Sequence, residues 1–322
     1  MTKPHHMQKT GSQKLTNCGT AVQAAVAVIK ENKMPYQIFT DSTADYGESM
    51  GPVMQNVKII PLGVKICGKS YNSGPDGDIT PKEFYDLQRQ GNYATTSQIN
   101  PSLYFSFFEP ELRRGRDILY LCFTSGLSGC FQSATMCIDE LKKQYPERNI
   151  VVIDTLCASV GEAFLVYEAA KRQAEGYDID DLVEWVLENR ISVCHWFTVD
   201  VFDHLKHGGR VSAMSAAVGT FLGIKPMLHV NVEGKLEAFE KPRGRNNAME
   251  AQMDRMRKGW EPEKGKLVVI GHGDNLPAAL ELKDRVLADF PDAEIHIAEI
   301  GLVIGAHTGP GMLALIYWGD NR

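Results

Sequence analysis

The chain has 322 residues and a formal net charge of −6 at pH 7, and 43% of its residues are hydrophobic while 23% are charged. No long basic block occurs, so nucleic acid is not an expected partner, because phosphate binding requires a positively charged surface. The seven cysteines form no C-x-x-C pair, and no apolar run reaches the roughly 18–20 residues that span a bilayer. We therefore expect a reduced, cytoplasmic protein without a transmembrane segment.

The first part of the chain alternates strands and helices. Residues 1–35 are expected to form an extension with a short amphipathic helix that ends near Lys30. The core then begins with a strand at 36–40, and Asp41-Ser-Thr-Ala-Asp45 predicts the start of a helix. Further strands are expected at 57–66, 117–123 and 149–154, and helices at 80–90, after Asn100-Pro101, and at 129–144, 158–176 and 178–190. Apolar strands that alternate with helices predict a parallel sheet.

The pattern changes after residue 190. Shorter β-rich segments are expected at 193–199, 225–232, 235–241, 266–271 and 293–299, with helices at 245–258 and 276–289. This arrangement predicts an α+β domain with a mixed or antiparallel sheet. The predicted organisation is an extension at 1–35, an α/β domain at 36–190 and an α+β domain at 191–322.

One familiar motif is present, but its context argues against a nucleotide site. Residues 63–70 satisfy the phosphate-loop pattern G-x4-G-K-S. That loop requires a helix to start at its lysine, whereas Val64 to Ile66 read as a strand and Tyr71-Asn-Ser-Gly-Pro cannot start a helix. We expect a hairpin turn at Gly68 instead.

Two clusters of hydroxyl side chains are candidates for binding an anion. Thr96 and Ser97 lie between a helix and the Asn100-Pro101 turn, where they either cap the next helix or donate to a ligand. The turn 124–129 follows the buried strand 117–123, and the N-terminus of the helix after it offers free N–H groups. Anion binding by this turn and simple capping by Ser125 or Ser128 both remain open.

Histidine, arginine and glycine residues add further candidates. His272 ends a strand between two glycines, and could donate to a carboxylate or act as a base toward Ser97. Arg210 follows the paired glycines 208–209 and could bind an anion or pair with a local acid. The run 301–311 contains four glycines and His307, which predicts a backbone in close contact with its surroundings. The sequence has no metal-ligand motif of the zinc-protease or Cys/His type.

Several short motifs, in this order and spacing, resemble the DegV family of bacterial lipid-binding proteins. They include Thr96-Ser-Gln98, Ser125-Gly-Leu-Ser-Gly129, Gly208-Gly-Arg-Val-Ser212 and Gly305-Ala-His-Thr-Gly-Pro-Gly311. The resemblance implies the EDD fold, with one long-chain fatty acid bound in a tunnel between two domains and with no cofactor. It also implies a carrier that is not itself a catalyst. Some family members are the lipid-carrying subunit of a fatty acid kinase, and present the carboxylate to a separate ATP-using subunit that makes an acyl phosphate.

The resemblance also assigns residues. It implies that the carboxylate is held by Ser97, with Thr96 beside it, by His272, and by backbone amides of the turn formed by Ser125, Gly126, Ser128 and Gly129. It implies that Arg210, or His207 before the paired glycines, engages the kinase subunit. This chain departs from the family at two positions: relatives often have Thr where Gly63 stands here, and Arg where His207 stands.

Two enzymatic alternatives remain open on the sequence. Ser97 and His272 could form the nucleophile and base of a hydrolase, although no Gly-x-Ser-x-Gly elbow surrounds Ser97. The structural kinship of the family with dihydroxyacetone kinases suggests a second option, a small-substrate enzyme with a narrow, polar pocket.

Overall fold

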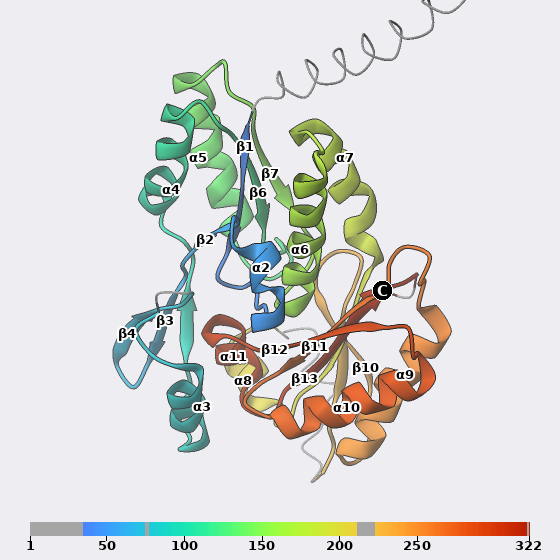
Figure 1. Ribbon diagram of the computed structural model, residues 1–322. Coiled ribbons are helices and arrows are strands. Elements are labelled where there is room, and N and C mark those ends of the chain that lie inside the picture. Colours follow the sequence, from blue (N-terminus) through green and yellow to red (C-terminus); the bar gives the residue numbers. More distant parts are fainter. Residues whose placement is uncertain (1–34, 75–76, 211–222, 321) are drawn as a thin grey trace, which may run out of the picture. The chain divides into compact units, whose positions relative to one another are not determined.

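A computed structural model describes residues 35–74, 77–210, 223–320 and 322. The predicted extension and its helix therefore lie outside the described residues. Tyr36–Arg322 forms one compact unit. None of the helices in the described ranges combines the length and apolarity needed to cross a membrane. Figure 1 shows the arrangement of the elements within this unit.

The first sheet is parallel throughout and has the strand order β2-β1-β6-β7. Its strands are β1 (Tyr36–Asp41), β2 (Lys58–Ile60), β6 (Asp117–Cys122) and β7 (Ile150–Asp154). Figure 1 shows α4 (Pro101–Arg113) and α5 (Cys130–Gln144) on one face, and α6 (Val160–Glu175) and α7 (Ile179–Asn189) on the other. Every residue of β6 is buried, because alternate side chains pack into the helical layers on opposite faces.

The second sheet is mixed and has the order β10-β9-β8-β13-β11-β12. Its strands are β8 (Val193–Thr198), β9 (Met227–Val230), β10 (Leu236–Glu240), β11 (Leu267–His272), β12 (Glu294–Glu299) and β13 (Leu313–Trp318). The β11–β12 pair is parallel and the other pairs are antiparallel. Helices α9 (Arg245–Gly259) and α10 (Leu276–Asp289) pack with one face of this sheet.

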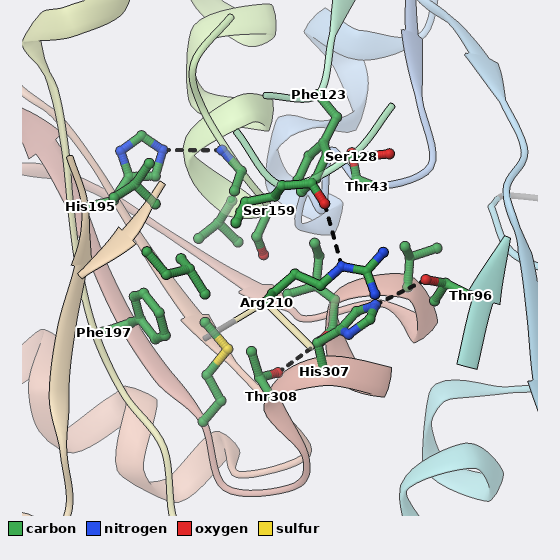
Figure 2. Close-up of a pocket in the computed structure, with 18 of the residues that line it drawn as sticks. Thr43, Thr96, Phe123, Ser128, Ser159, His195, Phe197, Arg210, His307 and Thr308 are labelled. Atoms are coloured by element: carbon green, nitrogen blue, oxygen red, sulfur yellow. Dashed lines mark hydrogen bonds between the residues drawn. The ribbon is translucent and has the colours of Figure 1, made fainter. Parts of the chain in front are cut away.

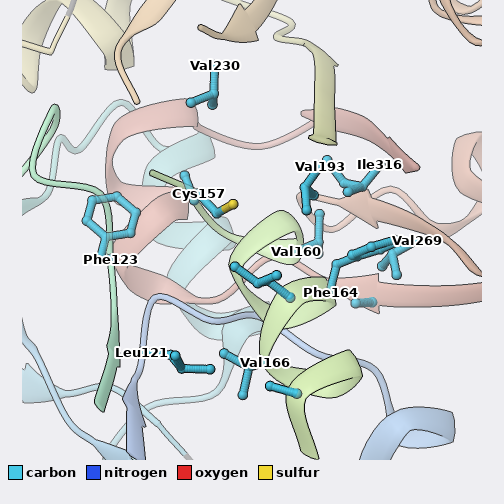
Figure 3. Packing of buried hydrophobic residues seen from close by; sticks show 14 of the residues in the cluster. Leu121, Phe123, Cys157, Val160, Phe164, Val166, Val193, Val230, Val269 and Ile316 are labelled. Atoms are coloured by element: carbon cyan, nitrogen blue, oxygen red, sulfur yellow. The ribbon is translucent and has the colours of Figure 1, made fainter. Parts of the chain in front are cut away.

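Helix α6 lies between the two sheets. Its first eleven residues are almost all buried, and its side chains belong to one apolar cluster with residues of both sheets. Figure 3 shows Leu121 of the parallel sheet and Val269 of the mixed sheet on different sides of this helix. Phe164 packs edge-to-face on Trp318 of β13, with 4.8 Å between the ring centroids. The shared helix joins the two sheets through one core.

A third, small sheet lies beside helix α11 (Leu302–Thr308). It has the order β4-β3-β5, with β3 (Gly63–Ile66), β4 (Lys69–Asn72) and β5 (Thr95–Ser97), and α3 (Pro81–Arg89) also contacts α11. Cys67 and Gly68, both with positive φ, form the two-residue turn of the β3–β4 hairpin. The hairpin predicted at Gly68 is confirmed, and the phosphate-loop pattern therefore has no helix after it.

Short elements complete the described chain: η1 (Glu48–Met50), α2 (Gly51–Met54), η2 (Arg190–Ser192) and α8 (Asp203–His207). The predicted fold class, a parallel α/β sheet followed by an α+β part with a mixed sheet, is confirmed. The helix predicted to start at Asp41 is wrong, since the next helical turn begins at Glu48. The domain boundary near residue 190 stays a prediction.

Candidate functional site

Side chains of the mixed sheet and of the small sheet, together with the segments that follow β1 and β6, line a cavity. It contains about 880 Å³ of space free of protein atoms, part of it open to solvent. Residues after the carboxyl ends of β1 and β6 and at the start of α6 form one side, where parallel sheets generally bind ligands. Strands β8, β9, β10 and β13, helix α11 and strand β5 form the rest. Figure 2 shows these walls converging on the cavity.

Most of the cavity wall is apolar. The apolar lining residues are Leu62, Phe123, Leu127, Ala158, Val160, Phe197, Leu205, Val230, Leu236, Val303, Ile304, Met312, Ala314 and Ile316. Apolar side chains of the mixed sheet, of helices α6 and α11 and of the loops after β2 and β6 therefore face the same space. A wall of this kind favours a hydrocarbon ligand, because every buried methylene loses contact with water.

Four polar residues interrupt the apolar wall, and the protein itself satisfies them. One of them is Thr308, whose hydroxyl donates to the carbonyl of Ile304 at 3.0 Å. Nε2 of His195 accepts from the N–H of Ala158 at 3.3 Å. The hydrogen of the neutral ring is then on Nδ1, which donates to the carbonyl of Val193 at 2.7 Å. Burial holds the pKa of His195 well below its usual range, so the ring is neutral. The hydroxyl of Ser159 donates to Asp45 at 2.6 Å. None of these three residues leaves a donor for a ligand.

The remaining polar wall residue, Thr43, lies against a pair of buried acids. Its Oγ1 is 2.5 Å from an oxygen of Asp41 and 2.6 Å from an oxygen of Glu162. A hydroxyl has one hydrogen, so one of the two carboxyl groups must be protonated and donate to it. Burial raises the pKa of both acids, which favours this shared proton. The Thr43 hydroxyl is therefore hydrogen-bonded within the protein and, like the other three residues, is not available to a ligand.

The polar end of the cavity has a different character. Thr96, Ser97, Gln98, Ser128, Arg210 and His307 line it. The hydroxyl of Ser97 is exposed and makes no hydrogen bond with another residue in the described ranges. Among the described lining residues, Arg210 is the one that carries a formal charge. Within the described part of the chain, this end therefore offers a hydroxyl and a guanidinium, and the guanidinium has no ion-pair partner.

His307 is held in its neutral form at this end. Its Nε2 lies 2.9 Å from Thr96 Oγ1, and its buried Nδ1 has no partner among the described residues. Burial, and then the nearby Arg210 and His207, lower the pKa of His307 to about 4. With Nδ1 unpartnered, the ring hydrogen is best satisfied at Nε2, where it donates to Thr96. The Thr96 hydroxyl can then donate onward.

Arg210 is placed over the same end. Figure 2 shows its guanidinium beside His307, with Thr96 close by. Its Nε donates to the carbonyl of Leu127 at 3.4 Å, and its Nη1 donates to the carbonyl of Gly208. Gly208 has a steric function here, because a Cβ at this position would overlap the His307 ring. Helix α8 can therefore approach α11 closely at this point.

The structure brings some of the predicted site residues together and places others elsewhere. Thr96, Ser97, Ser128 and Arg210 all line the cavity. His272 is not among the lining residues, and its Nδ1 accepts from the N–H of Asn275 at 3.2 Å. The histidine at the polar end is His307, which the sequence analysis noted only as part of the glycine-rich run.

The turn after β6 differs from its predicted role in part. The N–H of Ser125 donates to Asp154 at 3.0 Å, and the N–H of Gly126 donates to Thr124 Oγ1 at 3.1 Å, so these two amides are occupied. Gly129 lies under the side chain of Gln98 and not on the cavity surface.

The second residue predicted for partner docking lies beside the cavity lining. The exposed His207 ring stacks on Tyr93 with 4.6 Å between centroids. Its role in docking stays a prediction.

Comparisons with known proteins agree with this fold. A family model described as "Uncharacterised protein, DegV family" matches residues 35–320. A DegV domain-containing protein of Clostridium perfringens is 39% identical over 289 residues, which cover 89% of this chain and 98% of the relative. The fatty-acid-binding DegV family protein of Thermus thermophilus superposes with a TM-score of 0.77 at 30% identity, covering 89% of this chain and all (100%) of its own.

A third similarity concerns the fold alone. The Fatty Acid Kinase (Fak) B3 protein of Streptococcus pneumoniae, solved with linoleic acid, superposes with a TM-score of 0.79 at 23% identity. The match covers 89% of this chain and 100% of that protein. The family model spans nearly the whole of the described chain, and the curated relative is similar over nearly its full length. The chain belongs to the DegV family.

Proposed function

We propose that this protein binds one long-chain fatty acid, with the acyl chain in the apolar cavity and the carboxylate at the polar end. The observation that carries the proposal is the uneven distribution of available polar groups along the cavity wall. Its interior polar side chains are satisfied by the protein, whereas one end combines the free hydroxyl of Ser97 with the charge of Arg210. The fatty-acid-binding relative from Thermus thermophilus supports the same ligand class.

The energetics favour a long acyl chain. At about 0.8 kcal/mol for each buried methylene, a chain of about 14 methylenes contributes roughly 11 kcal/mol before the costs of association. A carboxylate with no partner would lose much of this gain on burial. At the polar end it would accept from Ser97 and Thr96 and lie near the guanidinium of Arg210, since charge-assisted hydrogen bonds are the stronger ones.

In this proposal, His307 takes the place that the sequence analysis gave to His272. It does not need to be charged, because its neutral ring supports Thr96 through Nε2. The hydroxyl of Thr96 then points its own hydrogen at the ligand. Ser128 lines the same end. Its hydroxyl lies 3.2 Å from the sulfur of Cys130, so it is a weaker candidate for the carboxylate.

We further propose that the bound acid is presented to a separate ATP-using subunit. Ser97, Gln98 and Arg210 are exposed at the surface, so a carboxylate held there would stay within reach of a partner protein. Trapping acyl phosphate with hydroxylamine, after mixing loaded protein with ATP and a purified fatty acid kinase subunit, tests this step. No hydroxamate above the level seen without ATP would argue against it.

The hydrolase alternative has less support. Ser97 and His272 do not meet at the cavity. The pair that does meet, Thr96 and His307, lacks an acid at Nδ1 to orient the ring among the described residues. The small-substrate alternative requires a polar pocket, and most of this wall is apolar.

A matched pair of ligands tests the proposal directly. The protein is purified from a bacterial host, its lipids are extracted and identified by mass spectrometry, and the stripped protein is titrated with palmitic acid and with hexadecanol. The two ligands have the same chain length and differ in the head group. We expect a copurified long-chain acid, and tighter binding of the acid than of the alcohol. Failure to bind either ligand refutes the function, and equal affinities refute the placement of the carboxylate.

Variants locate the head group. Ser97→Ala removes one hydrogen bond to a charged group and should weaken palmitate binding by roughly tenfold to a hundredfold. The matched control is Ser70→Ala on strand β4, which is exposed and lies outside the cavity lining. The control should bind palmitate as the unaltered protein does.

A further inference from the structure

Two strands of the mixed sheet show how the cavity runs from its polar end. Strand β8 leads into α8 and on to Arg210, and β13 follows α11, which carries His307. The edge of the sheet at which β8 ends and β13 begins therefore lies at the polar end. Positions further from this edge lie deeper in the cavity, and Figure 2 shows His195, near the start of β8, on the opposite side of the cavity from Thr96.

One row of side chains crosses the mixed sheet at this deep position. His195 of β8 pairs with Ile316 of β13. Val230 of β9 pairs with Leu236 of β10, and the β8–β9 register places Val230 beside His195. All four side chains line the cavity. We call Leu236, Val230, His195 and Ile316 the far row.

Beyond the far row, the same face of the sheet is covered by packed core. The next positions on this face are Val193 and Trp318, which pair with each other, since alternate residues of a strand share a face. Both are almost completely buried, and neither lines the cavity. Trp318 instead packs on Phe164 of α6. In the described part of the chain, the cavity therefore ends at the far row.

His195 is fixed firmly in this row. Both ring nitrogens are hydrogen-bonded to the backbone, at Ala158 and Val193. The ring also fills the space over Gly161, because a Cβ there would lie 1.9 Å from His195 Nε2. The imidazole thus packs between β8 and α6 and has no free nitrogen for a ligand.

We propose that the far row closes the acyl-chain site and that His195 limits the length of the fatty acid, an inference that rests on the proposed function. An acid with its carboxylate at the polar end buries each added methylene until its terminal methyl reaches the far row. A longer acid meets the packed core around Trp318. A polar group at the chain end would be buried there without a hydrogen-bond partner.

A series of saturated acids tests the closed end on the unaltered protein. Stripped protein is titrated with myristic, palmitic, stearic and arachidic acids in competition with a fluorescent fatty acid. Affinity should rise roughly fourfold with each added methylene up to a limiting length and then stop rising. The ω-hydroxy form of the acid that binds best should bind roughly tenfold more weakly or worse. Equal affinities would mean that the chain end stays in water, which would overturn the closed end.

Variants test the role of His195. In His195→Ala the space over Gly161 joins the cavity, so an acid two methylenes longer than the limiting length should bind roughly tenfold more tightly than it binds the unaltered protein. This variant leaves the buried N–H of Ala158 without its partner, which lowers stability. Ile316→Ala shortens another member of the far row without this loss, and should shift the limiting length in the same direction.

The matched control is Leu315→Ala on the same strand. Leucine and isoleucine are isomers, and Leu315 is also fully buried, but it belongs to the apolar cluster on the other face of the sheet and does not line the cavity. Its profile of affinity against chain length should match that of the unaltered protein. An unchanged limiting length in both far-row variants would overturn the inference, as would an equal shift in the control. If the unaltered protein binds none of the acids, the proposed function itself fails, and that outcome is recognised before any variant is made.

Discussion

The ionisation of His307 gives the most direct test of the electrostatics at the polar end. Its pKa in the folded, ligand-free protein is about 4, against an ordinary value of 6.5, because the ring is largely buried and lies near Arg210. Between these two values the unfolded chain binds the proton more readily than the folded protein does. Stability therefore falls as the pH drops from about 6.5 toward 4.

The size of the effect follows from the shift. Each pKa unit corresponds to about 1.4 kcal/mol, so the full shift contributes about 3 kcal/mol, and about 2 kcal/mol of this is lost between pH 7 and pH 4.5. The buried acids and the other histidines titrate as well, but they are common to the protein and to a His307→Gln variant. The difference between the two proteins isolates His307.

Urea unfolding of the stripped protein and of His307→Gln, at pH 7 and at pH 4.5, provides the measurement. Glutamine keeps an amide that can donate to Thr96 but does not titrate. We expect the variant to lose about 2 kcal/mol less stability than the unaltered protein over this pH interval. Parallel pH dependence of the two proteins would refute the reasoning, because it would mean that His307 has the same pKa in the folded and unfolded states.

Two further predictions concern the helix between the sheets. Gly161→Ala should destabilise the protein by about 2 kcal/mol or more in thermal unfolding, since its Cβ would overlap the buried ring of His195, whereas Gly51→Ala should change stability by less than about 1 kcal/mol. Phe164→Ala should cost about 3–5 kcal/mol in urea unfolding, because it removes a fully buried ring packed on Trp318, and a loss below about 1 kcal/mol would contradict the packing described.

The apolar runs of the sequence predicted most strands of the two large sheets, but not β13, which lies between β8 and β11 in the mixed sheet. Strands β6 and β7 are short apolar runs bounded by turn residues, and helix α5 after β6 buries one apolar face. The capping box at Thr80 and Glu83 fixed the start of α3, and both of its hydrogen bonds are present. In these elements local sequence and tertiary packing favour the same structure.

The glycine-rich run behaves differently, and this is why the position of His307 could not be predicted. Residues 302–308 form helix α11, although Gly305 lies in its middle and glycine is a poor helix former. The helix is stabilised by packing, since a Cβ at Gly305 would lie 2.7 Å from the hydroxyl of Tyr85, and Gln88 donates to the Gly305 carbonyl. A tertiary contact between segments more than two hundred residues apart leaves no periodic signal in the sequence.

The Asp41–Asp45 motif shows a similar limit. It has the composition of a helix N-cap, but Asp41 instead accepts from Tyr120 and from the N–H of Phe123, deep between strands. Its partner Glu162 comes from α6, and Thr43 joins the two acids. The motif therefore keeps a wall hydroxyl turned away from the cavity, a function that depends on long-range contacts.

Two glycines near the polar end are nevertheless visible in the sequence and are informative about the side chains that lie beside them. Gly208 leaves room for the His307 ring, and Gly63 leaves room for the Ser97 hydroxyl, while neither has a positive φ. At these two positions the ordinary backbone geometry, together with a neighbour inside contact distance, indicates that another group needs the space. In this chain those groups are two side chains that line the polar end, so each glycine points to a residue of the candidate site.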